Sequence, residues 1–143
     1  MAGYFNKLMG YMYDGTNVSG EELTNGVFVT VVAGKANLVT AKNTSLKLRV
    51  LEKTTFAGLP AVEVLVVDEG STEIYMVENL FTDNQDAPYD NSANVIKAGE
   101  YVRMRRPETV DHMIISVDST LYGKVNVDDT VVVDANGVLA SAT

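Results

Sequence analysis

Apolar and polar residues alternate along much of this chain with the period of two that is typical of β-strands. Leu46, Leu48 and Val50 are separated by single basic residues, so the three apolar side chains share one face of an extended segment. Runs rich in Val, Ile, Phe and Thr, which pack well on pleated sheets, predict further strands. These runs are residues 27–32, 36–40, 62–67, 72–77, 101–104, 113–117 and 130–133.

Turn-forming residues separate the predicted strands at short intervals. Asn25-Gly26 precedes the first run and Asn136-Gly137 follows the last. Residues 68–71 predict a hairpin that joins 62–67 to 72–77. After the first twenty residues, strand signals recur every 8–14 residues and no run with the helical period reaches three turns. This pattern predicts an all-β fold, either a small sandwich or a partly open barrel.

The first twenty residues follow a different pattern, with aromatic and Met residues interleaved with Gly. We therefore divide the chain into an N-terminal arm, residues 1–20, and a single β domain, residues 21–143. The i, i+3, i+4, i+7 spacing of one face of a short amphipathic helix is present at Phe5, Leu8, Met9 and Met12. Gly10 in its middle costs about 1 kcal/mol relative to Ala, so both a short helix and an extended arm stay open.

The role of this arm also has two alternatives. The arm closes one end of the chain's own core as a helix or strand, or it docks on a neighbouring subunit. Aromatic and Met side chains suit docking because they bury large areas with few or soft torsions. The candidate interface residues in the arm are Tyr4, Phe5, Leu8, Met9, Tyr11, Met12 and Tyr13.

Charge and composition exclude several classes of function. The net charge is −8, from 11 Lys and Arg against 19 Asp and Glu; residues 1–53 carry +2 and residues 54–143 carry −10. A general nucleic-acid binder should be basic, so nucleic acid is not an expected partner. With no Cys and one His, a thiol nucleophile, a Cys-ligated metal and a multi-histidine site in one chain are all excluded. We therefore expect no cofactor and no metal.

The chain also has no recognisable membrane or targeting segment. No window approaches the roughly 20 apolar residues that a membrane span needs. Met1 to Gly20 lacks a basic head followed by a continuous apolar run. The sequence therefore predicts a soluble protein made in a cytoplasm, with no membrane partner.

The one histidine, His112, is the best starting point for a catalytic site. Asp111, Ser116 and Asp118 lie close to it in sequence, so this segment contains the residue types of a Ser/His/Asp catalytic set. Strand alternation, however, puts His112 and Asp111 on opposite faces, and the chain has no G-x-S-x-G motif to expose a serine. We therefore predict no catalytic residue and no enzymatic activity.

Residues 82–95 form the most polar stretch and predict a long surface loop. Asp83, Asp86 and Asp90 could supply oxygen ligands to Ca²⁺, but their spacing does not match a calcium-binding loop. A glycan or other ligand could instead contact this loop together with Tyr75 and Tyr89. A plain solvated acidic loop is the third alternative.

Arg103, Arg105 and Arg106 make up the one basic cluster. Strand alternation predicts that Arg103 and Arg105 share a face, either as a solvated strand edge or as a contact with an acidic neighbour. We add all three to the candidate partner interface.

The C-terminal part of the chain resembles a known family. The segment KAGEYVRMRRP at residues 97–107 is followed by an apolar strand and then by GKVNVDDTVVVDANGVL at residues 123–139. This pattern is similar to the head decoration, or cement, proteins of tailed bacteriophages, and the resemblance covers about residues 95–143. The family implies a non-enzymatic virion protein, made in the host cytoplasm, that binds the outside of an assembled capsid, often as a trimer. Its implied partners are the major capsid protein and copies of itself.

Two other classes of function stay open from the sequence. One is a ligand- or glycan-binding β module. The other is a different phage structural component, such as a head fibre or a tail protein.

Overall fold

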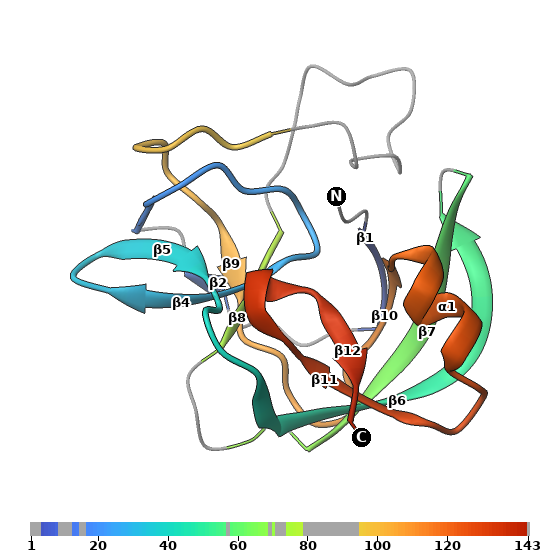
Figure 1. Ribbon diagram of the computed structural model, residues 1–143. Coiled ribbons are helices and arrows are strands. Elements are labelled where there is room, and N and C mark those ends of the chain that lie inside the picture. The colour runs from blue at the N-terminus through green and yellow to red at the C-terminus, as the bar shows by residue number, and fades with distance from the viewer. Residues whose placement is uncertain are drawn as a thin grey trace.

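The computed structural model describes residues 17–56, 58–68, 70, 74–78 and 95–142, together with the backbone of two strands at residues 4–8 and 13–14. These residues form two six-stranded sheets, with one short α-helix and one 3₁₀ turn (Figure 1). One of the sheets is curled into a half-barrel. The prediction of an all-β sandwich or partly open barrel is therefore confirmed.

The first sheet, sheet A, is antiparallel throughout and is built around one long hairpin. The two strands of that hairpin, β6 and β7, occupy the middle of the sheet (Figure 1). In spatial order its strands are β1 (Tyr4–Leu8), β10 (His112–Ser116), β7 (Leu59–Asp68), β6 (Asn43–Phe56), β11 (Thr130–Val133) and β12 (Leu139–Ser141).

The second sheet, sheet B, is made of shorter strands. Its one parallel pair is β3 with β5, and the other neighbours are antiparallel. In spatial order its strands are β2 (Tyr13–Asp14), β9 (Met104–Arg105), β8 (Tyr75–Val77), β4 (Phe28–Val32), β5 (Lys35–Leu38) and β3 (Val18–Ser19).

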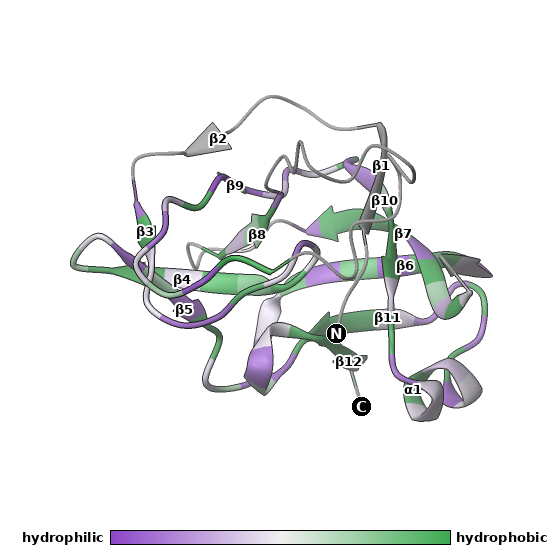
Figure 2. Ribbon diagram, turned by 90° about the horizontal axis from the view of Figure 1, so that it is seen from above, coloured by the Kyte–Doolittle hydropathy of each residue, from purple (hydrophilic) through white to green (hydrophobic). Residues whose placement is uncertain are grey.

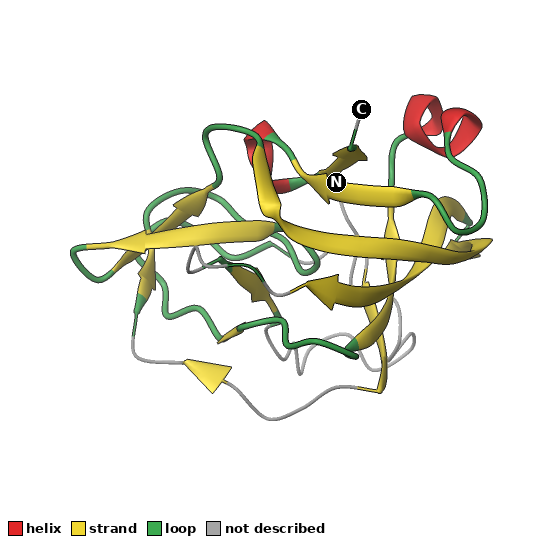
Figure 3. Cartoon of the chain, turned by 90° about the horizontal axis from the view of Figure 1, so that it is seen from below, coloured by secondary structure: helices red, strands yellow, loops and turns green. Residues whose placement is uncertain are grey.

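The two helical segments lie near β11 and β12 (Figure 3). Helix α1 (Ser119–Lys124) begins after Asp118, whose side chain accepts a hydrogen bond from the backbone N–H of Leu121 at 2.7 Å. This is the usual way in which an Asp satisfies a free N–H at a helix start. The 3₁₀ turn η1 (Ala135–Gly137) joins β11 to β12, as the Asn136-Gly137 turn predicted.

Two hydrophobic cores lie on the two faces of β4. Phe28 packs in the larger core, which lies between the sheets and includes Leu48, Val64 and Met113. The next residue, Val29, points the other way because side chains alternate along a strand, and it packs in the smaller core. Figure 2 shows β4 and β11 as mostly hydrophobic ribbon, as expected for strands that contribute to these cores. The smaller core consists of Leu23, Val27, Val29, Ala36, Val77, Ile96, Val102 and Met104.

The predicted hairpin between residues 62–67 and 72–77 is wrong. β7 has β6 on one side and β10 on the other, so both of its hydrogen-bonding edges are occupied. β8 belongs to the other sheet, where it pairs with β4 and β9.

The described parts of the N-terminal arm pair with this chain's own sheets. β1 pairs with β10 at one edge of sheet A, and β2 pairs with β9 at one edge of sheet B. The short helix is therefore wrong over Tyr4–Leu8, where hydrogen bonding to β10 gives extended backbone and Gly10 already disfavoured the helix. Met9, Tyr11 and Met12 lie outside the described residues, and docking of the arm on a neighbouring subunit stays a prediction.

Candidate functional site

The far end of sheet B carries a row of side chains from four neighbouring segments. Directly paired residues in a sheet point to the same face, so the strand registers decide which side chains belong together. The registers pair Val32 with Lys35, Lys35 with Val18, and Val18 with Tyr101. We call this row, Val18, Val32, Lys35 and Tyr101, the hairpin patch.

The hairpin patch is open to solvent although it contains large apolar side chains. Val32 and Tyr101 are each 72% exposed, Lys35 is exposed, and Val18 is half-buried. Strand alternation puts Val32 on the same face as Phe28, which is fully buried against sheet A. The face therefore changes from buried to exposed within one strand, at the end of β4 where the β4–β5 hairpin projects from the molecule (Figure 1).

Local sequence explains why this hairpin is well defined. Ala33 and Gly34 both have positive φ, 53° and 77°, as a two-residue type I′ turn requires. β3 is held between β5 and the segment at residues 99–102 by backbone hydrogen bonds on both sides. The Ser19 hydroxyl adds a 2.6 Å bond to the carbonyl of Lys97. The patch is thus carried on paired backbone rather than on a free loop.

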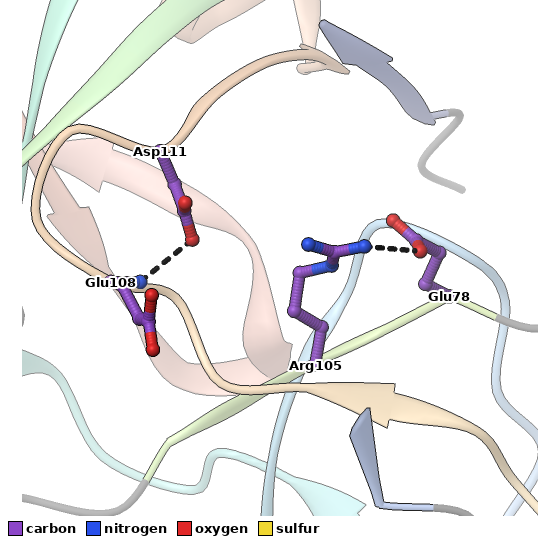
Figure 4. Close-up of polar contacts among 4 residues, drawn as sticks. All are labelled: Glu78, Arg105, Glu108 and Asp111. Carbon is purple, nitrogen blue, oxygen red and sulfur yellow. Dashed lines mark hydrogen bonds and ion pairs between the residues drawn. The ribbon is translucent and has the colours of Figure 1, made fainter. Parts of the chain in front are cut away.

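Of the predicted arginine cluster, Arg105 lies inside the molecule. It is 2% exposed, and its guanidinium donates to the Glu78 carboxylate at 3.2 Å (Figure 4). The register pairs Arg105 with Met76, so it points into the layer between the sheets. The predicted contact with an acidic neighbour therefore exists within this chain, and Arg105 is not available to a partner as the interface prediction required. Arg103 and Arg106 are half-buried.

The residues of the Ser/His/Asp set make contacts within the fold. His112 Nε2 lies 2.6 Å from Glu63 Oε2 on the neighbouring strand β7. Asp118 caps α1, and Asp111 accepts from the Glu108 N–H at 2.7 Å (Figure 4). Ser116 is buried, with 6% exposure.

Across the described part of the chain, no group of three or more His, Asp or Glu side chains could hold a metal ion. A hollow of about 280 Å³ lies between α1 and β12 and is smaller than most small-molecule sites. Tyr75 is half-buried against the smaller core. Residues 79–94, with Asp83, Asp86, Tyr89 and Asp90, lie outside the described residues, so the calcium and glycan alternatives stay predictions.

The hairpin patch was missed by sequence reasoning for a physical reason. Val32 ends an apolar run in which residues 27–29 are buried and Thr30 and Val31 are half-buried. Alternation decides which face a residue occupies but not at which residue along the strand that face stops being covered. The one available signal was Ala33-Gly34, because residues beside a tight hairpin turn are often at the surface.

None of the helices that the structure describes is long and apolar enough to cross a membrane. Comparison of the chain with protein-family models, curated proteins and solved structures finds no match.

Proposed function

We propose that this chain is a non-enzymatic docking protein that binds the outer surface of an assembled phage head as a decoration subunit and stabilises it. The partners in this proposal are the major capsid protein and copies of the chain itself, and the place of action is the virion surface. The capsid part rests on the resemblance of residues 95–143 to head decoration proteins. The docking part rests on the hairpin patch.

The observation that carries docking is the 72% exposure of both Val32 and Tyr101 in one row of a paired sheet. Tyr is enriched among residues that dominate binding energy, because its ring buries a large area and its hydroxyl can still bond. Side chains on a sheet lose little additional backbone freedom on binding, which lowers the cost of association. Because copies on a capsid repeat by symmetry, modest contacts at each site add up through avidity.

The charge distribution supports the same function. The net charge of −8 keeps the chain soluble and discourages non-specific contacts. Three of the four residues of the hairpin patch come from residues 1–53, which carry a net charge of +2, and Lys35 is exposed between Val32 and Val18. Such a surface can be buried against a partner while the long, flexible Lys side chain keeps its ammonium group in water.

Substitution of Tyr101 by Ala is expected to weaken binding to heads at least tenfold. Loss of one well-placed Tyr at an interface typically costs about 1–2 kcal/mol or more, and 1.4 kcal/mol corresponds to a factor of ten. The measurement is co-sedimentation of the purified chain with heads assembled without it, titrated to give an occupancy curve. Because Tyr101 is largely solvated, the variant should melt at nearly the same temperature as the wild type.

Val127→Ala is the matched control, since Val127 is 54% exposed in a turn that lies outside the hairpin patch. It should leave occupancy unchanged. Equal binding of Tyr101→Ala and the wild type would show that the hairpin patch is not the docking surface. A wild-type chain that does not sediment with heads at all would contradict the decoration role, and localisation on tails or fibres would then favour another phage component.

A further inference from the structure

Three turns in the second half of the chain share one hydrogen-bond pattern. They span residues 97–100, 108–111 and 126–129. In each, the N–H of the fourth residue donates to the carbonyl of the first, at 2.9–3.1 Å. In each, the carboxylate of the fourth residue also accepts from the N–H of the first, at 2.7–2.8 Å. Glu100, Asp111 and Asp129 supply these carboxylates.

All three turns continue into the same kind of β-bulge. The third and fourth residues of each turn bond to a single residue on the neighbouring segment, which is Ser19, Val66 or Val50. In a G1 bulge, which has this two-against-one pattern, the first bulge residue has a positive φ and is usually Gly. The corresponding residues here are Gly99, Val110 and Asp128, with φ of 88°, 74° and 75°.

Val110 is the exception among the three. Gly has no Cβ to clash at positive φ, and Asp is one of the few other residues that visit this region readily. A β-branched residue such as Val is a genuine outlier there and is held at a cost in stability. Val110 is also 66% exposed, so burial within this chain does not offset that cost.

The backbone pairing beside Val110 brings exposed apolar residues close to charged residues of both signs. Val110 bonds through its backbone to Val66, and the next residue of β7, Val67, points outward and is 42% exposed. On the β6 side lies the exposed Lys47, which is the register partner of the exposed Asp68. Glu108, half-buried, begins the turn that contains Val110. We call Lys47, Val67, Asp68, Glu108 and Val110 the turn face.

We propose that the turn face docks on the turn face of a second copy of this chain, related by a two-fold axis. A two-fold contact brings the same patch of each subunit together, so the patch must be complementary to itself. The turn face meets this condition because Lys47 of one copy can oppose Asp68 or Glu108 of the other, while Val67 and Val110 meet at the centre. Opposite charges around an apolar centre give such a contact its register and speed its formation.

Under this proposal, the strain at Val110 is retained because its side chain is buried between subunits. The contact is distinct from the hairpin patch, which belongs to the other sheet, and does not depend on the capsid proposal. Replacing Val110 with a residue that tolerates positive φ should therefore move two quantities in opposite directions. The folded monomer should become more stable, and the dimer should become weaker.

Val110→Asn tests this directly with the full chain. Its melting temperature, measured at a concentration where the wild type is monomeric, should rise by about 3–6 °C. Its dimer dissociation constant, measured by sedimentation equilibrium, should rise at least tenfold relative to the wild type. Val127→Asn is the matched control, since it also removes an exposed Val, 54% exposed in another turn, but from a residue that is not among those with positive φ. It should leave the dissociation constant unchanged and should not raise the melting temperature.

A charge exchange identifies the second copy as the occupant. Lys47→Glu alone and Asp68→Lys alone should each lose self-association, because each turn face then carries charge of mainly one sign. An equimolar mixture of the two variants should associate, since the acidic face of one meets the basic face of the other. Contacts within one chain cannot produce this result.

Several outcomes would overturn the proposal. These are a wild-type chain that stays monomeric at several hundred micromolar, a Val110→Asn variant that dimerises as tightly as the wild type, and a mixture of charge variants that stays monomeric. A Val110→Asn variant with an unchanged or lower melting temperature would overturn the argument from strain. Because the variant is expected to be more stable, loss of association cannot be attributed to misfolding.

Discussion

Arg105→Met is expected to lower the free energy of unfolding by about 3–5 kcal/mol, a large fraction of the total stability of a domain of this size. The substitution keeps an unbranched apolar stem but leaves the Glu78 carboxylate, whose side chain is 14% exposed, without the guanidinium that lies 3.2 Å from it. A buried charge that loses its partner keeps its desolvation cost and loses the attraction that offset it. The measurement is urea unfolding at neutral pH, with the midpoint and slope compared to the wild type.

The double variant Arg105→Met, Glu78→Met should recover most of this loss, because removing both charges also removes the desolvation cost. Arg49→Met is the surface control. Arg49 and Asp128 are 4.0 Å apart with side chains 45% and 78% exposed, and such pairs contribute less than about 1 kcal/mol. If Arg105→Met lowered the free energy of unfolding as little as Arg49→Met does, the buried pair would contribute little to the stability of the fold.

Gly137→Ala is the second substitution with a large expected effect, a loss of about 3 kcal/mol or more. Gly137 has a φ of 68°, and a Cβ placed there would lie 2.3 Å from the carbonyl oxygen of Phe28. That oxygen belongs to the backbone of β4 in the middle of sheet B, so it cannot move aside as a flexible side chain would. Thermal and urea unfolding should both show the loss.

Gly99→Ala separates the two causes of this loss. Gly99 also has a positive φ, 88°, but a Cβ there would have no atom within 4 Å. Its substitution should therefore lower the free energy of unfolding by only about 1–2 kcal/mol, because an Ala in the left-handed region is less favourable than a Gly. If Gly99→Ala and Gly137→Ala were equally destabilising, the close approach of η1 to β4 would not be the reason that residue 137 is Gly.

The strands themselves were largely predictable because side-chain alternation is local information. Residues 130–133 form β11 as predicted, and residues 46–50 lie within the longer β6. The lateral partner of a strand is not local, because alternation decides which face is buried but not which strand lies alongside. This is why the predicted hairpin gave β7 the wrong partner on one of its edges. The strand that pairs with β7 at that edge, β10, begins more than forty residues later in the chain.

The candidate site was less predictable for a related reason. The sequence leaves Arg105 either on a solvated strand edge or in contact with an acidic neighbour, because charged side chains are seldom fully buried without a partner. Its partner Glu78 is 27 residues away in sequence, and only the pairing of β8 with β9 brings the two together. Val110 has no sequence signal at all, because the Val of a strand and the Val of a strained turn look alike until the backbone angle is known.

The division of β4 between two cores has a consequence for how the molecule opens. Phe28 and Val29 are adjacent, and each anchors the same backbone in a different core. Loss of the smaller core would expose one face of β4 while the other face still held it in place, so the amides of β4 should exchange with solvent through global unfolding alone. Measuring amide exchange at β4 therefore tests whether the two cores unfold as one cooperative unit. If they do, the substitutions at residues 105 and 137 should shift a single unfolding transition.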